Sequence, residues 1–310
     1  MSRILIWNVH GSYINALVRG RHEYLLPLTP ARDGDGAGRL GYPWPESARE
    51  VPSDALRDED IDAVVVQRPH EPALVEDWTG RRPGRDVPGI WLEHNAPQGR
   101  VAEMRHPIAD HPGMLLVHVT HFNDLFWDAC EASTRVIEHG IVDPGYRYGG
   151  ELARAAVVIN EARRRGRVTG TDLLERFAEV APLDLFGIDA AALGGVGDVP
   201  YELLPGEVGR RRVYLHPNRW TSLGLSLIEA MHVGMPVVAL ATTEAIEAVT
   251  PDAGVISTDV ERLTAALRRL IADPDEARER GLAARRSALA RYGLARFLSD
   301  WDAVLEEVGA

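Results

Sequence analysis

The sequence contains a single cysteine, Cys130, among 310 residues. One cysteine cannot form a disulfide within the chain and offers no cysteine pair for a zinc site. No apolar run approaches the length needed to cross a membrane, and the first residues lead into a strand pattern at 4–7 rather than into a signal peptide. We therefore expect a cytoplasmic protein, and peripheral contact with the inner face of a membrane stays open.

The chain also lacks an excess of positive charge. It has 34 Lys and Arg against 46 Asp and Glu, which gives a net charge of −12. A nucleic-acid-binding protein needs a basic face to neutralise phosphates, so the composition argues against nucleic acid as a partner. With 45% hydrophobic residues, the chain is long enough to bury the cores of two domains.

Short apolar runs alternate with helical patterns along the whole chain, which predicts an α/β fold of two doubly wound, Rossmann-like parallel-sheet domains. The turn-rich segment 143–150 is the best linker. We expect a first domain over 1–145, a second over 146–292, and a final helix over 293–310. The spacing of Asp273, Pro274 and Glu276 predicts a helix that begins after Asp273. The predicted strands lie at 3–7, 22–28, 62–66, 89–92, 114–119, 134–141, 155–159, 183–187, 213–215 and 237–240.

One βαβ unit, at 213–240, holds the strongest candidate site. Its loop, 217–224, follows the carboxyl end of a strand, where open parallel sheets bind ligands. We expect a helix from near Ser222, whose backbone N–H groups from 222 to 225 would favour an anion such as a diphosphate. Glu229 would face the same side and accept hydrogen bonds from sugar hydroxyls. The alternative is that Glu229 only supports its own helix.

Three short matches give this unit a family resemblance. Gly224-Leu225, Glu229-Ala230-Met231 and Gly234-Met235-Pro236-Val237-Val238 resemble the signature of the family-four (group 1) retaining glycosyltransferases, which have the two-domain GT-B fold. The resemblance implies that Glu229 holds the nucleotide ribose and that 222–225 contact the donor. It also marks two departures: Thr221 replaces a glutamate that contacts the donor sugar, and Leu223 replaces a phenylalanine.

Four arginines gather in the loop after the strand at 155–159, at positions 163, 164, 165 and 167. Such a cluster suits a phosphate, since guanidinium groups pair with phosphates in a bidentate manner, and a solvated basic loop is the alternative. The resemblance implies that Arg164 contacts the donor diphosphate. The lysine expected beside it is Thr169, and Arg167 could supply the missing cation.

The first domain offers two further candidates. Gly11 and Ser12 follow the first strand and open a helix, an arrangement that cradles phosphates, although one glycine is a weak signal. The resemblance strengthens it, because the family has a glycine-rich loop here. His94 ends the strand at 89–92, and the resemblance implies that it lies near donor and acceptor. Otherwise His94 would be a histidine satisfied by local hydrogen bonds.

We expect no metal and no other cofactor. Asp33-Gly34-Asp35 lies in a glycine-rich run without the flanking strand of a metal site, so we interpret it as a solvated turn. The histidines at 106, 111, 118 and 121 lack the spacing of metal ligands on a helix.

The resemblance implies a metal-independent, retaining transfer of a sugar from a nucleotide-diphosphate sugar to an acceptor that is a glycan, a lipid or a small metabolite. It also implies that the two domains face a cleft and that the last helix packs back on the first domain. Two alternatives stay open: a nucleotide-sugar epimerase on the same fold, and a non-catalytic sugar-nucleotide-binding partner subunit.

Overall fold

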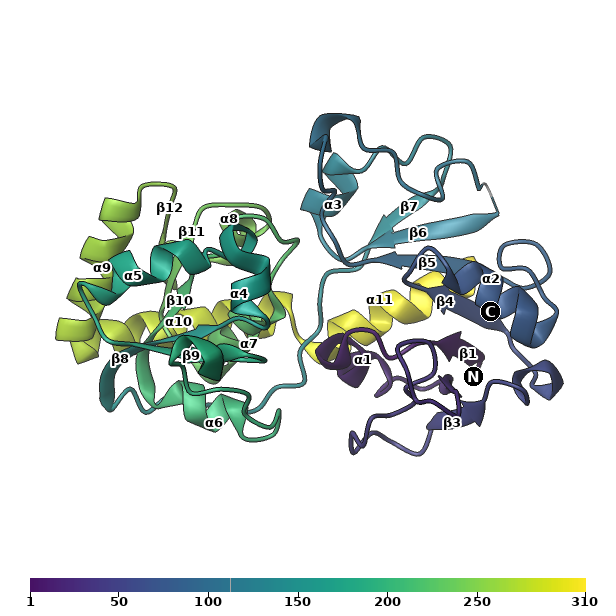
Figure 1. Cartoon of the computed structure of the whole chain (residues 1–310), viewed down its shortest axis with the longest axis horizontal. Coiled ribbons are helices and arrows are strands. Elements are labelled where there is room, and N and C mark those ends of the chain that lie inside the picture. Colours follow the sequence, from purple (N-terminus) through teal and green to yellow (C-terminus); the bar gives the residue numbers. More distant parts are fainter. Residues whose placement is uncertain (112) are drawn as a thin grey trace. The chain divides into compact units, whose positions relative to one another are not determined.

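The computed structural model describes residues 1–111 and 113–310. The chain forms two compact units. The first contains residues 1–142 and 294–310, and the second contains residues 143–293. Both are α/β units with wholly parallel sheets, which confirms the predicted fold class. Figure 1 shows the two sheets.

The first unit has a seven-stranded sheet in the order β3-β2-β1-β4-β5-β6-β7. Its central strands are runs of branched apolar residues, as expected for strands that are covered on both faces. The strands are β1 (Arg3–Ile6), β2 (Glu23–Leu28), β3 (Ala48–Pro52), β4 (Ala63–Val66), β5 (Gly89–Glu93), β6 (Met114–His118) and β7 (Thr134–Val136), and the helices are α1 (Gly11–Leu17), α2 (Glu71–Thr79), α3 (His121–Phe126) and α11 (Leu294–Glu307).

The last helix, α11, completes the first unit although it follows the second unit in sequence. Trp301 is fully buried and its indole N–H donates to the hydroxyl of Tyr13 in α1 at 3.0 Å. The Phe297 ring meets Tyr13 edge-on at 5.2 Å. Next to Trp301 in the chain, Asp302 accepts a hydrogen bond from buried His22 at 2.9 Å. Figure 1 shows α11, in yellow, next to α1.

The second unit has a five-stranded sheet in the order β12-β11-β10-β8-β9. One face packs on α9 through Val213, Leu215 and Val238, which meet Leu263 and Leu267. The strands are β8 (Leu152–Val158), β9 (Leu183–Phe186), β10 (Arg211–His216), β11 (Val237–Leu240) and β12 (Gly254–Ser257), and the helices are α4 (Ala162–Arg165), α5 (Leu174–Ala178), α6 (Leu204–Gly209), α7 (Leu225–Val233), α8 (Ala245–Ala248), α9 (Val260–Ala272) and α10 (Pro274–Arg291).

Most predicted elements are confirmed, with some differences at their limits. The Asp273 carboxylate caps α10 by accepting from the backbone N–H groups of Asp275 and Glu276, as predicted. The strand predicted over 134–141 ends at Val136. Two strands, β3 and β12, were not predicted. The helix predicted from near Ser222 begins three residues later, at Leu225.

Candidate functional site

The loop between β10 and α7 lies at the carboxyl edge of the second sheet. Gly224 is the residue before the helix and has an extended backbone, with φ −66° and ψ 119°. The first-turn amides are therefore those of Leu225 and Ser226, because the N–H of Leu227 already donates to the Gly224 carbonyl at 2.9 Å. The prediction that residues 222–225 open the helix was wrong in this respect: the extended Gly224 delays the helix start.

His216 explains why glycine is needed at position 224. A Cβ on Gly224 would lie 2.7 Å from Cε1 of the His216 ring, which is closer than side-chain carbons approach each other. His216 is itself 3% exposed, and its burial lowers the pKa of the imidazole to about 4. The ring is therefore neutral at physiological pH, and it fills the space directly under the start of α7.

Glu229 lies one turn further along α7 and is half-buried. The same face carries Ser226, whose Oγ accepts a hydrogen bond from the Tyr214 hydroxyl at 2.9 Å. Burial and, to a smaller extent, the negative charge of Glu229 raise the pKa of Tyr214. Glu229 is thus close to Tyr214 and Ser226 at the end of β10. Its contact with a ribose stays a prediction.

Two loops at this edge are joined through their backbones. Gly170 has φ +73°, and a Cβ there would lie only 1.9 Å from the Pro217 carbonyl oxygen. The Val168 carbonyl accepts from the N–H groups of Arg219 and Trp220 at 2.9 and 3.1 Å. The arginine loop after β8 and the loop before α7 therefore form one continuous surface.

Arg219, which the sequence analysis did not single out, strengthens this junction. Its guanidinium makes a bidentate pair with the Asp172 carboxylate at 2.5 and 2.9 Å and also donates to the Arg167 carbonyl. The guanidinium of Arg219 lowers the pKa of Asp172. The Arg219 side chain therefore joins the loop before α7 to the arginine loop after β8.

Among the clustered arginines, Arg164 and Arg167 have acidic partners, whereas exposed Arg163 donates to the Ala192 carbonyl and Arg165 is half-buried. Arg164, the residue that the resemblance favoured, pairs with Glu161 at 2.5 Å, and Arg167 pairs with Asp172 at 3.1 Å. Arg165 is half-buried, and no carboxylate of the described residues lies within ion-pair distance of it. Desolvation by burial and the neighbouring Arg164 lower its pKa. Arg165 is therefore the member of the cluster best suited to a bound anion.

Thr169 and Thr221, which stand where the family resemblance expects a lysine and a glutamate, differ in how exposed they are. Thr169 is fully buried, and its hydroxyl lies 3.3 Å from the Gly166 carbonyl and 3.2 Å from the Thr171 hydroxyl. Its hydroxyl supports its own turn, and its predicted contact with the donor stays a prediction. Thr221 is half-buried, whereas Ser222 and Leu223 are each 6% exposed.

In the first unit, His94 follows β5 and is half-buried beside other rings. Its centroid lies 4.2 Å from that of His10 and 4.8 Å from that of Tyr13. Its Nε2 lies 2.9 Å from the side-chain oxygen of Gln67. Desolvation, followed by the charges of His10 and His139, holds the pKa of His94 well below its usual value. His94 is therefore a neutral imidazole, and its predicted contact with substrates remains a prediction.

Gly11 and Ser12 begin α1 and are both half-buried. A Cβ on Gly11 would lie 2.5 Å from the Tyr42 hydroxyl oxygen, so the close approach at this glycine is made by a side chain of the same unit. The predicted phosphate contact of this loop stays a prediction.

The acidic segment 33–35 forms a turn in which Asp35 makes contacts with other parts of the first unit. Asp35 pairs with His70 at 2.8 Å and with Arg68 at 3.3 Å, and its carbonyl accepts from the Trp7 indole at 2.8 Å. These contacts tie Asp35 to the segments after β1 and β4, while Asp33 and Gly34 stay exposed in a turn, as predicted. Within residues 1–111 and 113–310, no three His, Cys, Asp or Glu side chains are arranged to hold a metal ion.

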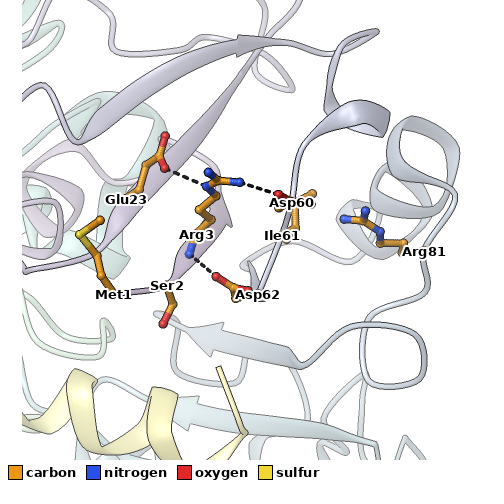
Figure 2. A pocket seen from close by; sticks show the side chains of 8 residues that line it. All are labelled: Met1, Ser2, Arg3, Glu23, Asp60, Ile61, Asp62 and Arg81. Carbon is orange, nitrogen blue, oxygen red and sulfur yellow. Dashed lines mark hydrogen bonds and ion pairs between the residues drawn. The ribbon is translucent and has the colours of Figure 1, made fainter.

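A pocket of about 540 Å³ lies at the opposite, amino edge of the first sheet (Figure 2). The guanidinium of Arg3 pairs there with Glu23 at 3.1 Å and Asp60 at 2.9 Å, and the Arg3 backbone N–H donates to Asp62 at 2.7 Å. The pocket is therefore polar and is lined by charges of both signs. In the described part of the chain, no helix is both long and apolar enough to cross a bilayer.

Comparison with known proteins agrees with this architecture. Residues 194–287 match the family model of the glycosyl transferases group 1. The sucrose-phosphate synthase of Thermosynechococcus elongatus superimposes with a TM-score of 0.75 at 15% identity and covers 99% of each chain. A glycosyltransferase from Rickettsia africae superimposes with a TM-score of 0.71 at 12% identity, over 99% of this chain and 97% of that one.

The structure of Anabaena HepE in complex with UDP gives a TM-score of 0.72 at 12% identity, over 99% of this chain and 100% of that one. No curated protein matches the sequence. At such identities the structural likeness establishes the fold, and the family model identifies the domain that contains the α7 site. The chain therefore has the GT-B fold, and residues 194–287 of its second unit match the group 1 glycosyl transferases.

Proposed function

We propose that the protein transfers a sugar from a nucleoside-diphosphate sugar to an acceptor, with retention of the anomeric configuration and without a metal ion. The observation that supports this most is the group 1 match over 194–287, because that range contains the loop before α7, the start of α7 and Glu229. These elements lie together at the carboxyl edge of a parallel sheet, where such sheets bind nucleotides.

The donor diphosphate would bind between the start of α7 and the arginine loop. The amides of Leu225 and Ser226 and the helix dipole favour a negative charge there, and the Arg165 guanidinium supplies a fixed positive one. Charge that develops on the leaving diphosphate would be stabilised by these groups, in the role that a metal ion has in other transferases. By resemblance, no protein nucleophile is needed, because the leaving phosphate can accept the proton of the acceptor.

The HepE structures contain UDP and UDP-glucose, which makes uridine nucleotides the first donor probes for this chain. We expect UDP to raise the thermal unfolding temperature with EDTA present, since a ligand that binds only the folded state stabilises it, by about 2.7 kcal/mol at 100 times its Kd. A rise that requires added Mg²⁺ or Mn²⁺ would contradict the metal-free proposal. Guanosine and adenosine diphosphates, tested in parallel, would identify another base.

Glu229→Ala tests the ribose contact. We expect this change to remove most of the UDP-dependent rise in unfolding temperature, because the carboxylate would accept hydrogen bonds from both ribose hydroxyls. Glu279→Ala is the matched control, since Glu279 is an exposed helical glutamate of the same unit. Equal UDP shifts in both variants and the unchanged protein would show that Glu229 does not hold the ribose.

A non-catalytic role as a sugar-nucleotide-binding subunit is the second candidate, and it is favoured by Thr221 and by the buried hydroxyl of Thr169. Incubation with UDP-glucose and simple sugar or lipid acceptors separates the possibilities. Transfer requires an acceptor, epimerisation changes the donor sugar without one, and a binding subunit leaves the donor intact while still showing the thermal shift.

A further inference from the structure

We propose that Gln67 is a positioning residue that fixes His94 as the Nε2–H tautomer, which leaves Nδ1 as a hydrogen-bond acceptor for a hydroxyl group of a substrate. The tautomer follows from contacts within the first unit alone. The assignment of the hydroxyl to a substrate rests on the proposed transferase function.

The orientation of the Gln67 amide decides the tautomer. Its Nε2 lies 2.8 Å from the Trp7 carbonyl oxygen, and a carbonyl oxygen can only accept a hydrogen bond. The amide nitrogen must therefore face Trp7, and the amide oxygen must face Nε2 of His94, 2.9 Å away. An oxygen at that distance requires a proton on the imidazole nitrogen, so Nε2 carries the hydrogen.

Gln67 is itself held firmly. It is 7% exposed and follows β4, while the carbonyl that it contacts follows the neighbouring strand β1. Its backbone N–H donates to the Glu71 carboxylate at 2.5 Å, and Glu71 is fully buried at the start of α2. The side chain thus links the segments that follow β1 and β5, while the backbone of Gln67 is held at the start of α2. Rotation of the amide would break both side-chain hydrogen bonds.

The surroundings of His94 keep it neutral. The ionisable groups that face it are His10, Tyr13 and His139, and Arg296 of α11 lies close enough to Tyr13 and His139 for its charge to act on them. No carboxylate of the described residues lies within ion-pair distance of His94. A neutral Nε2–H imidazole offers a lone pair at Nδ1, which suits a hydroxyl donor and repels a phosphate oxygen.

Nitrogen NMR of the full-length protein with ¹⁵N-labelled histidine tests the tautomer without any substrate. His94→Phe identifies the His94 signals by their loss. At pH 7.5 we expect a protonated Nε2 and an unprotonated Nδ1. Gln67→Leu should lower the ratio of the two tautomers about five-fold, which corresponds to one net hydrogen bond. Gln98→Leu is the matched control, since Gln98 is the other glutamine of the chain and is exposed.

Three results would overturn the proposal: a protonated Nδ1, a charged imidazole at pH 7.5, or an unchanged tautomer ratio in folded Gln67→Leu. If that variant does not fold, Gln67→Glu carries the test. A carboxylate at this position accepts the same hydrogen bond and favours the charged imidazole, so the titration midpoint of His94 must rise. An unchanged midpoint would contradict the contact.

Turnover separates this proposal from the proposed function. If transfer occurs, the acidic limb of its pH profile should move to higher pH in Gln67→Glu, together with the NMR midpoint, while Gln98→Leu keeps the original profile. If the protein shows the predicted tautomer and no transfer with any acceptor, the transferase proposal fails and the tautomer assignment stands.

Discussion

At the scale of single residues, the choice of arginine over lysine determines how the positive charges of this protein are paired. All 34 basic side chains other than histidine are arginines, since the sequence contains no lysine. An arginine stays charged at any physiological pH and binds carboxylates through two parallel hydrogen bonds. Around α7 this gives strong internal pairs, such as Arg219 with Asp172, and leaves Arg165 as the half-buried cation without such a pair among the described residues.

Arg165→Ala should therefore weaken diphosphate binding. We expect a loss of about 10-fold to 100-fold in UDP affinity, because a charge-assisted hydrogen bond contributes about 1.5–3 kcal/mol. The stability of the ligand-free protein should change little, since the substitution removes a desolvated charge. Arg163→Ala is the control, because Arg163 is exposed and donates only to the Ala192 carbonyl. Isothermal titration with UDP measures both, and equal affinities would exclude a role for Arg165.

Gly224→Ala tests the contact between the loop and His216. The added methyl group would lie 2.7 Å from the buried ring, so we expect a destabilisation of about 1–3 kcal/mol from overpacking. Gly206→Ala offers the comparison, because no atom lies within 4 Å of its Cβ position in α6, and alanine there should be neutral or slightly stabilising. Urea unfolding measures both changes, and equal midpoints for the two variants would refute this account of Gly224.

The sequence could not identify Arg165 as the exceptional arginine. Arg164, Arg165 and Arg167 look alike in sequence, and their difference depends on which of them reaches Glu161 or Asp172 once the loop has folded. Gln67 was missed for a similar reason. Its role depends on the Trp7 carbonyl, sixty residues away, and no pattern in the sequence records that contact.

At the scale of elements, the buried apolar strands were predicted from the sequence, whereas the edge strands β3 and β12 were missed. The strands β1, β4, β5 and β11 are buried and consist of nearly continuous apolar residues. The edge strand β3 carries Arg49 and Glu50, and Arg49 is held by Glu23 and Glu59 from neighbouring segments. Its strand conformation depends on those partners. The start of α7 was misplaced by three residues because Gly224 is extended beside the buried His216 ring, and the sequence does not record that contact.

The contribution of α11 to the first unit gives a prediction at this scale. Trp301→Ala should lower the free energy of unfolding of the first unit by about 3–5 kcal/mol, since it removes a fully buried ring and a hydrogen bond to Tyr13. Calorimetry should show one of two transitions moving to lower temperature while the other stays. Glu306→Ala, which removes only an exposed ion pair with Arg21, should leave both in place. A shift of both transitions would contradict independent units.

At the scale of the whole molecule, buried histidines make stability depend on pH. Burial is the main cause that lowers the pKa of His118 and His216 to about 4 and of His139 to about 3. In the unfolded chain each would have a pKa of about 6.5. The folded state therefore binds fewer protons below pH 6.5, so this contribution is complete above pH 6.5 and is lost as the pH falls toward 4.

We expect urea unfolding at pH 5 to show a loss of about 1–2 kcal/mol for each such histidine, relative to pH 7.5. His139→Phe should reduce the loss of stability at pH 5 by about 1–2 kcal/mol, because it removes one of these titrating groups. The substitution breaks no hydrogen bond, since neither ring nitrogen of His139 has a partner among the described residues. His121→Phe replaces an exposed histidine and should keep the full pH dependence. The same slope in all three proteins would refute the assignment.

The placement of α11 also bears on how the protein forms during translation. The second unit is continuous in sequence, whereas the first needs residues 294–310 to cover Tyr13 and His22. The ribosome synthesises the strands of the first sheet, residues 3–136, long before it synthesises Trp301. The first unit therefore stays incomplete, with part of its apolar surface exposed, until residues 294–310 have been made. The second unit is made later but can fold earlier, because all its residues are available before α11. We therefore expect chaperones that bind exposed apolar surface to bind the amino-terminal half of this chain during translation.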